Sequence, residues 1–441
     1  PDPLGRPARD DFVFPGGVPL ACDLAKSSGA YLADARSGKE VLDFIGHATT
    51  GPLGYNHPKL KDEEFFKNLC VLAMHMPVNC ETHASEFAHF SETFDIVPLG
   101  GQFANLLFVS GSFAAVETSL KTAIGWKQQK NILAKNKRRR GGQILHFRRG
   151  FQGRLGLALS LTELFDNPGD QWAPRLKWPR VANPAMTFPF GDDARAKVEE
   201  AEREALTQID LAYERAPGEI AAILIEPIQG EGGIVIPPEG YLRAAAQLCR
   251  EHNVLLIADE IQTGLGRTGK LLACQHEGVN PDGLILGKAL GGGILPVSMF
   301  LARRDVMEVF TPGDHGSTFG GNPLGAAVGL EALNILIDEK LADNSARMGR
   351  YLLDELAKID SPVVKEVRGR GLFIGLEINP ELASARAICE ALMERGLLSK
   401  ETHQTVVRLA PPLVIGKAEL DWAIRQIREV IAEIDDLRLA S

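Results

Sequence analysis

The stretch Asn253-Val-Leu-Leu-Ile-Ala-Asp259-Glu260-Ile261-Gln262 is an apolar run that ends abruptly in carboxylates. A second run, Asp282-Gly-Leu-Ile-Leu-Gly-Lys288-Ala-Leu-Gly-Gly-Gly293, brings a lysine into a glycine-rich turn. Apolar runs of this length are typical of buried β-strands. A charge at the end of a buried strand is costly unless something pairs with it. The two runs therefore predict a site that needs an acid and an amine together.

The bulk properties are those of a globular protein of enzyme size. The chain has 441 residues, of which 45% are hydrophobic, and a formal net charge of −9. This length is sufficient for two domains with sizeable cores. The mild acidity argues against nucleic acid as a partner, and the basic run Lys135–Arg140 is interpreted as a solvated loop rather than a nucleic-acid patch.

Cysteine usage and hydropathy exclude several other classes of protein. The 6 cysteines are scattered without a C-x-x-C pair, so neither a disulfide framework nor a metal site is indicated. The sequence contains no run of 18 apolar residues and no signal-peptide pattern. We therefore expect no membrane partner and a cytoplasmic location.

Apolar runs alternate with helix-like stretches through the middle of the chain. One such stretch, Tyr241–His252, is predicted to be a helix between the two strands that carry the acid and the lysine. Alternation of this kind indicates an α/β fold with a mostly parallel sheet flanked by helices, and ligands bind at the carboxyl ends of its strands. The predicted strands are Asn105–Val109, Gln143–Phe147, Ile220–Glu226, Val254–Ala258, Gly283–Gly287 and Val297–Ala302.

The pattern changes after Pro323. Apolar residues from Leu420 to Ile434 recur at steps of three and four, which predicts an amphipathic helix. With Val363–Ile378 and Val406–Ile415 as strand material, the C-terminal part resembles a smaller α+β domain. We expect residues 1–60 to contribute to this small domain, residues 61–322 to form a large cofactor-binding domain, and residues 323–441 to form the rest of the small domain.

Pyridoxal 5'-phosphate (PLP) is a cofactor that requires both an amine and an acid. Its aldehyde forms a Schiff base with a lysine, and an acid keeps its pyridine nitrogen protonated. Lys288 and Asp259 fit these two roles as catalytic residues, and Gln262 could donate to the ring hydroxyl. Taken singly, Asp259 could also be a helix cap and Lys288 a snorkelling lysine.

Two small-residue loops could supply donors to a phosphate. Gly111, Ser112 and Phe113 stand between a predicted strand and a helix, where the helix N-terminus favours an anion. The segment Gly316–Pro323, which contains Thr318, also leads into a helix. Either loop alone is weak evidence, because glycine turns often precede helices.

Aromatic and charged residues complete the candidate site. Phe151 could stack on the cofactor ring, and Arg154 could hold a substrate carboxylate, although a core aromatic and a surface arginine are the simpler interpretations. Arg408 suits a second carboxylate, and Glu231 could neutralise it when that carboxylate is absent. A structural salt bridge between the two remains an open alternative.

In order along the chain, these motifs resemble the class III (ω-) aminotransferases, which are PLP enzymes of fold type I. The most specific part is Asp259–Gly269 with Lys288 and Ser317–Pro323. Within the class, Lys400–His403 and Arg408–Ile415 are similar to ornithine 5-aminotransferases. Lysine 6-aminotransferases are the closer likeness for other stretches, which are Asp23–Tyr31, Trp126–Asn131 and Lys177–Arg180.

The resemblance implies transfer of a terminal amino group from L-lysine or L-ornithine to 2-oxoglutarate. It gives Lys288 the Schiff base, Asp259 the pyridinium nitrogen and Arg154 the α-carboxylate of the donor. Arg408 would hold 2-oxoglutarate, with Glu231 as its gate. The other implied cofactor-binding residues are Gly111, Ser112, Phe113, Phe151, Gln152, Gln262 and Thr318. Thr318 would reach the phosphate of a neighbouring subunit, which implies a homodimer, or a higher oligomer, with shared sites.

The chain departs from the pattern of the class at three places. The phosphate loop is one residue longer than the commonest form, a feature that resembles the lysine enzymes. Gln152 replaces the usual histidine or tryptophan. Ala48 stands where ornithine enzymes place a tyrosine that helps to bind the α-carboxylate, which favours lysine as the donor.

Other functions stay open on the same scaffold. An acetylornithine or 4-aminobutyrate aminotransferase, an amino-acid racemase or a decarboxylase would also need Lys288 and Asp259. A racemase or a decarboxylase has no need of a gated second arginine, so Glu231 and Arg408 favour transamination. A PLP-binding regulator without turnover is a further alternative, although such proteins normally carry a fused DNA-binding domain.

Overall fold

The computed structural model describes residues 20–77, 82–99, 101–103, 105–136, 140–163, 173–188 and 191–439. Residues 137–139 of the predicted basic loop, Cys80 and residues 1–19 lie outside this range. None of the helices in the described ranges is long and apolar enough to cross a membrane. In the same ranges, no cluster of three or more histidine, cysteine or acidic side chains could hold a metal ion.

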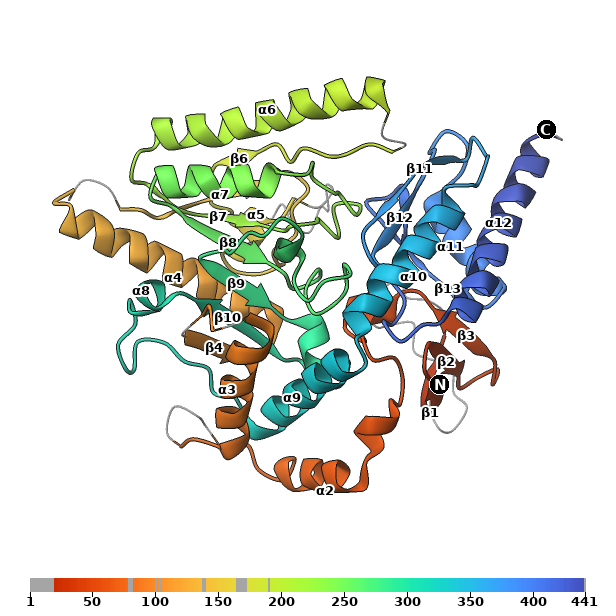
Figure 1. Cartoon of the computed structure of the whole chain (residues 1–441), viewed down its shortest axis with the longest axis horizontal. Coiled ribbons are helices and arrows are strands. Elements are labelled where there is room, and N and C mark those ends of the chain that lie inside the picture. The colour runs from red at the N-terminus through yellow and green to blue at the C-terminus, as the bar shows by residue number, and fades with distance from the viewer. Residues whose placement is uncertain are drawn as a thin grey trace.

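A seven-stranded sheet forms the centre of the larger part of the molecule (Figure 1). Five neighbouring strands, β6, β5, β7, β8 and β9, run parallel, and β10 lies antiparallel to both of its neighbours. The mostly parallel sheet predicted from the sequence is thus confirmed. In spatial order, the strands are β4 (Asn105–Val109), β10 (Ser298–Ala302), β9 (Gly283–Leu286), β8 (Leu255–Asp259), β7 (Ile220–Ile225), β5 (Gln143–Phe147) and β6 (Arg180–Val181).

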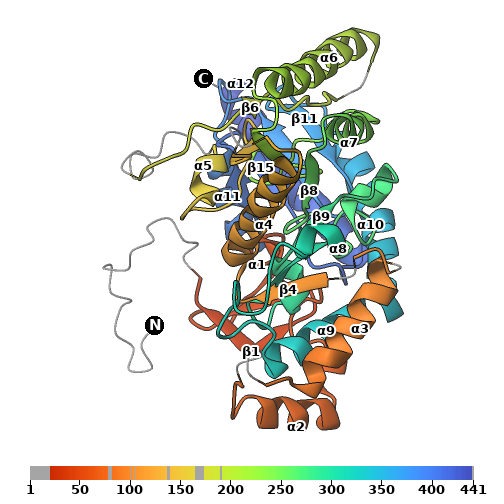
Figure 2. The ribbon, with the colours of Figure 1, turned by 90° about the vertical axis from the view of Figure 1, so that its left-hand side faces the viewer.

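Both faces of this sheet are apolar because helices cover both (Figure 2). In β9, Leu284 and Leu286 pack into one core cluster, whereas Ile285 packs into another on the opposite face. Strands that are buried on both faces are therefore continuous apolar runs, as the sequence showed. Helix α4 (Ser112–Leu133) covers the face of Ile285, and the other face packs against α3 (Ser85–Leu99), α6 (Asp192–Arg215) and α7 (Tyr241–Glu251).

A second, four-stranded sheet forms the centre of the C-terminal part. It is antiparallel throughout, in the order β11 (Val364–Gly369), β12 (Ile374–Ile378), β15 (Val406–Leu409) and β14 (Lys400–Thr402). The predicted strand over Val406–Ile415 is too long, because β15 ends at Leu409. Pro411 and Pro412 follow, and proline has no backbone N–H to donate to a sheet.

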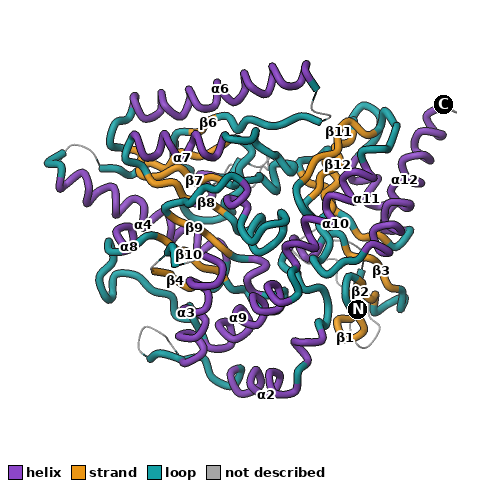
Figure 3. The backbone as a smooth tube through the Cα atoms, in the orientation of Figure 1, coloured by secondary structure: helices purple, strands orange, loops and turns teal. Residues whose placement is uncertain are grey.

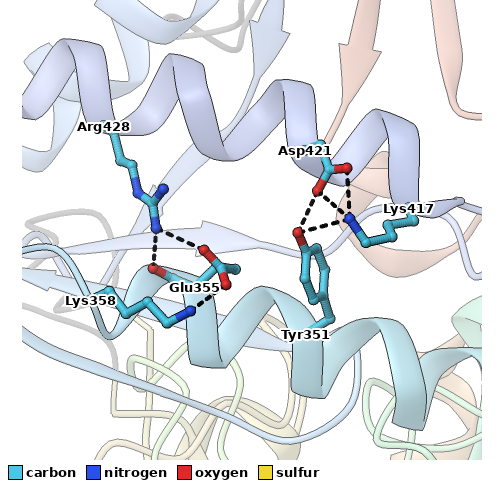
Figure 4. Close-up of polar contacts among 6 residues, drawn as sticks. All are labelled: Tyr351, Glu355, Lys358, Lys417, Asp421 and Arg428. Carbon is cyan, nitrogen blue, oxygen red and sulfur yellow. Dashed lines mark hydrogen bonds and ion pairs between the residues drawn. The ribbon is translucent and has the colours of Figure 1, made fainter.

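Three helices pack around this sheet: α10 (Leu341–Leu356), α11 (Ala385–Glu394) and α12 (Lys417–Leu439). Helix α12 is the predicted amphipathic helix, and it buries Leu420, Ile424, Ile427 and Ile431. Polar contacts at the surface also connect it to α10 (Figure 4): Arg428 donates to the Glu355 carboxylate at 2.9 Å, and Tyr351 donates to Asp421 at 2.5 Å. Exposed contacts of this kind contribute little to the free energy of unfolding, so packing of the buried apolar side chains holds the helices together.

The N-terminal strands join the C-terminal part of the chain (Figure 3). Strands β1 (Cys22–Ser28), β2 (Tyr31–Asp34) and β3 (Glu40–Asp43) form a sheet that β13 (Leu397–Leu398) completes by pairing parallel to β3. This pairing supports our proposal that residues 1–60 and 323–441 share a small domain and that residues 61–322 form the large domain.

Helix α9 (Pro323–Asp338) connects the two proposed domains, since it packs against both α3 and α10. Short helical segments fill the remaining connections. These are α1 (Gly46–Thr49), η1 (Pro58–Lys61), α2 (Glu63–Leu72), α5 (Ala158–Leu161), η3 (Ala273–His276), η4 (Lys288–Gly291) and α8 (Arg304–Met307).

We predict that Gly349→Ala destabilises the small domain. A Cβ at Gly349, in α10, would lie 2.0 Å from the backbone oxygen of Gly371, which cannot move aside as a side chain can. We expect a loss of about 1–3 kcal/mol in the free energy of unfolding, although alanine is the better helix former. Denaturant titration measures it. Gly142→Ala is the control, since a Cβ at Gly142 meets nothing within 4 Å; equal stabilities of the two variants would contradict the prediction.

Candidate active site

Three neighbouring parallel strands deliver ionisable side chains to one edge of the large sheet. Asp259 is the last residue of β8, Glu226 follows β7, and Lys288 follows β9 after Gly287. Because the carboxyl ends of parallel strands lie at the same edge, the three side chains line one cavity. The sequence prediction that Asp259 and Lys288 meet there agrees with this arrangement.

Most of the predicted site residues line this cavity. Ser112, Phe113, Phe151, Gln152, Arg154, Gln262, Asp259 and Lys288 are all on its wall. A second cavity shares Ser112 and Lys288 with the first and adds Gly111, Thr50 and Ser298. The two cavities therefore meet at the lysine.

Lys288 is held in an unusual backbone conformation. Its φ is 44°, in the left-handed region that costs energy for a residue with a side chain, and such residues cluster at functional sites. Enclosure by protein lowers the pKa of the Lys288 ammonium to about 8, although Glu231 and Asp259 oppose the shift. A substantial fraction of the amine is thus neutral, and so nucleophilic, near pH 8.

Two carboxyl groups share the same enclosure. Burial raises the pKa of Asp259 to about 7, and the N–H of Ile261, which donates to Asp259 Oδ1 at 3.0 Å, only partly offsets this. Burial, and then the charge of Asp259, raises the pKa of Glu226 to about 8. Both acids would be stabilised as anions by a further cation in the cavity.

A candidate anion site lies at the start of α4. Gly111 precedes the helix with φ 105°, a conformation that favours glycine, so the first turn opens directly from β4. The Ser112 hydroxyl lies 3.3 Å from that of Ser298. A Cβ at Gly287 would lie 2.4 Å from Ser112 Oγ, so this glycine leaves room for the hydroxyl pair. Helix N–H groups and two hydroxyls suit a phosphate.

The segment after β5 presents an aromatic ring and a cation. The Arg154 guanidinium lies 5.6 Å from the centre of the Phe151 ring, and Arg154 is exposed. Gln152 is buried, and its Nε2 donates to Glu226 Oε1 at 3.2 Å. Glu226 also accepts from the N–H groups of Phe151 at 2.9 Å and Gly230 at 3.1 Å. Glu226 therefore fixes the segment that carries Phe151 and Gln152.

An ion pair between Arg408 and Glu231 lies beside the cavity residue Gln262. Arg408, in β15, donates to Glu231 Oε1 at 2.6 Å, and only 3% of the Arg408 side chain is exposed. Burial opposes ionisation of Glu231, but the positive charges of Arg408 and Lys288 lower its pKa. With its amide oxygen turned toward these cations, Gln262 accepts from Lys288 Nζ and Arg408 NH1, both at 3.3 Å.

These residues fit the expected cofactor. The cavity wall carries a partly neutral lysine, a buried acid that forms no ion pair with the described residues, and a helix N-terminus with two hydroxyls. In addition, Arg408 Nε is buried without a hydrogen-bond partner among the described residues, as expected of a group that receives a ligand.

Thr318 and Glu226 lie differently from the other residues. Thr318 is exposed and lines neither cavity, so within one chain the structure does not bring it to the site. Glu226 was not among the predicted site residues. The sequence did carry a signal, because Glu226 follows the apolar run Ile220–Ile225 in the way that Asp259 ends its own strand.

Comparisons with known proteins agree with this site. The family model described as Aminotransferase class-III matches residues 13–431. The ornithine aminotransferase of Bacillus subtilis is 44% identical over 419 residues, which is 94% of each chain. A lysine aminotransferase structure from M. tuberculosis has a TM-score of 0.87 at 34% identity, covering 96% of this chain and 97% of that one. An ornithine aminotransferase structure from Toxoplasma gondii has a TM-score of 0.82 at 33% identity, covering 96% and 93%.

We predict that Glu226→Gln changes how the stability of the cofactor-free chain depends on pH. The Glu226 carboxyl has a pKa near its ordinary value of 4.5 when unfolded and of about 8 when folded, so folding takes up a proton between these values. The contribution of the Glu226 carboxyl to the free energy of unfolding therefore falls as the pH rises from 4.5 to about 8. The glutamine variant lacks this loss.

The free energy of unfolding of Glu226→Gln, relative to the parent, should accordingly increase from about pH 5 to about pH 8. Denaturant titration across this range measures the difference. Glu199→Gln, which changes an exposed carboxyl, is the control and should run parallel to the parent. A difference for Glu226→Gln that stays constant with pH would contradict the raised pKa.

Proposed function

The chain belongs to the class III aminotransferases, PLP-dependent ω-aminotransferases of fold type I, and on this basis we propose that it moves the terminal amino group of L-ornithine or L-lysine to 2-oxoglutarate. The products are the corresponding semialdehyde, or its cyclic imine, and L-glutamate. The observation that carries the proposal is the ion pair between the buried Arg408 and the partly exposed Glu231, beside Lys288. A gated arginine is what an enzyme with two differently charged substrates needs.

When bound, PLP supplies an aldehyde that condenses with amines and a ring that accepts the electrons of a broken C–H bond. Lys288 would hold the cofactor and then, as a free amine, carry a proton between two carbons. Asp259 would keep the proton on the ring nitrogen, and Gln262 would contact the ring hydroxyl. The remaining cofactor contacts would come from Gly111, Ser112, Phe113, Phe151 and Gln152, with the partner subunit's Thr318 at the phosphate.

The two substrates place different demands on one cavity. The diamino acid has its only carboxylate far from its reacting amine, and Arg154, at the exposed end of the cavity wall, would hold that carboxylate. The oxo acid has a carboxylate beside its reacting carbon, and Arg408 would hold it. With the donor present, an unpaired Arg408 would attract the wrong end of the molecule. Glu231 prevents this by pairing with the guanidinium, since Arg408 NH1 donates to Glu231 Oε1 at 2.6 Å.

Ornithine and lysine differ by one methylene, which is worth about 1–3 kcal/mol in a pocket. The 44% identity to an ornithine aminotransferase supports ornithine. Ala48 and the likeness to a lysine aminotransferase structure support lysine. A panel of amino donors with 2-oxoglutarate, with products identified by mass, tests the proposal. Exclusive turnover of acetylornithine or 4-aminobutyrate, or racemisation without amino transfer, would replace it.

We also propose a homodimer with shared sites, and a cytoplasmic location. The exposed Thr318 loop supports the first, because a second chain would have to bring it to the phosphate. Five free cysteines in the described part of the chain support a reducing compartment. Sedimentation of the purified protein tests the dimer.

We predict that Asp259→Asn lowers kcat much more than it weakens cofactor binding. A carboxylate about 4 Å from a pyridinium contributes roughly 4 kcal/mol, and losing it corresponds to about a thousandfold in rate. The amide keeps the size but cannot hold the proton on the ring nitrogen. Steady-state kinetics at saturating PLP measures kcat, with a cofactor titration in parallel. A kcat within a few-fold of the parent would refute the assigned role.

We predict that the Arg408 and Glu231 variants separate the two half-reactions. Arg408→Ala should slow the reaction with 2-oxoglutarate by roughly tenfold or more while leaving the ornithine or lysine half-reaction nearly intact. Glu231→Ala should unmask Arg408 and accelerate reaction with α-amino donors such as glutamate or alanine. Single-turnover absorbance measures each half-reaction. Equal losses in both halves for Arg408→Ala would reduce the pair to a structural salt bridge.

A further inference from the structure

The loop that carries Glu231 is closed on itself. Gln229 and Val235 exchange backbone hydrogen bonds of 3.1 and 2.9 Å, and the N–H groups of Gly233 and Ile234 donate to Gly230 O at 3.1 and 3.2 Å. Glu231 lies inside this closed turn. The backbone position from which the Glu231 carboxylate extends is therefore fixed relative to the loop. It is fixed relative to Arg408 only if other contacts hold the loop as a whole.

The loop contains a strained residue. Ile234 has φ 55°, an outlier for a β-branched residue, and its side chain is fully buried beside Ile228, Ile236 and Phe373. Strain of this kind persists only where the surroundings over-determine the conformation. Contacts from outside the loop would add to its own hydrogen bonds in opposing relaxation.

Two residues of the small domain supply these contacts. Arg368, in β11, donates through Nε to the backbone oxygens of Gly233 at 3.1 Å and Ile234 at 3.0 Å, and through NH2 to that of Gly233 at 2.6 Å. Thr402, in β14, donates from its hydroxyl to the backbone oxygen of Glu231 at 2.9 Å. The loop is thus held at Glu231 itself and at the strained turn that follows it.

The Arg368 side chain is itself fixed. It is buried, with 7% exposure, and NH2 also donates to Glu377 Oε2 at 2.6 Å. Glu377 in turn accepts from the Thr405 hydroxyl at 2.8 Å. A guanidinium paired on one side with a carboxylate presents its remaining donors in one orientation.

We propose that Arg368 and Thr402 are positioning residues that set the donor preference, because they hold the backbone of Glu231 where its carboxylate reaches Arg408. This inference rests on the gating role proposed for Glu231. With the backbone anchored, the gate opens by rotation of the Glu231 side chain and closes again onto the same guanidinium. Without the anchors, Ile234 relaxes, the carboxylate withdraws from Arg408, and α-amino donors gain access.

The test compares donor preference among holoenzyme variants. Thr402→Val removes the hydroxyl at nearly constant volume, and Arg368→Lys removes the forked donor but keeps the charge. Single-turnover rates with glutamate and with the ω-amino donor give a ratio that a general loss of stability does not change. We expect this ratio to rise roughly three- to tenfold in each variant, the range expected for one lost hydrogen bond. Thr402→Ser should restore the parental ratio.

Matched controls separate this inference from the gate itself. Thr207→Val removes an exposed hydroxyl that donates within α6, away from the loop and from Arg368, and should leave the ratio unchanged. Thr402→Val added to Glu231→Ala should have no further effect, because no carboxylate remains to be positioned. If Glu231→Ala leaves the ratio unchanged, the gate fails and the inference fails with it. If Glu231→Ala raises the ratio while Thr402→Val and Arg368→Lys do not, the positioning role alone is overturned.

Discussion

The collection of three acids and two bases in one enclosure is the constraint on which the rest of the structure depends. Glu226 and Asp259 lie beside Lys288 at the strand ends of the large sheet, and Glu231 pairs with Arg408 across the junction of the two proposed domains. Removing such charges from water costs several kcal/mol each unless partners compensate. The parallel strand ends bring together Glu226, Asp259 and Lys288, but only the small domain can supply Arg408. The site is therefore complete only when both domains are in contact.

That contact is itself built from a buried cation. Arg267 follows the Asp259 strand, and its guanidinium donates to the backbone oxygens of Leu372 at 3.1 Å and Pro411 at 2.5 Å in the small domain. The Ser345 hydroxyl, in turn, donates to the Arg267 backbone oxygen at 2.8 Å. These bonds fasten the loop after β8 to the segment that follows Arg408. Arg267 is fully buried, so a hinge motion between the proposed domains would expose its guanidinium or leave it without hydrogen-bond acceptors. We therefore expect side-chain rotations, rather than domain motion, to reshape the cavity.

The sequence predicted six of the seven strands of the large sheet to within one residue at each end, because strands buried on both faces are uninterrupted apolar runs. The edge strand β6 was missed, because Arg180 and Val181 form no such run. Asp259 and Lys288 were predictable because a charge is conspicuous at the end of an apolar run. Arg368 and Thr402 were not, because their roles depend on carbonyl groups contributed by a distant loop and leave no local pattern. The end of β15 was missed because Pro411 and Pro412 stand inside an otherwise apolar stretch.

The pairing of β3 with β13 bears on how the protein is made. The first three strands leave the ribosome early, but the strand that completes their sheet is synthesised only after the entire large domain. Until then, the edge of β3 lacks its native neighbour, and an unpaired edge can associate with other chains. Sequence-distant pairing of this kind also forms slowly. The proposed large domain can assemble while translation continues, whereas the N-terminal sheet can close only after Leu397 and Leu398 have been synthesised.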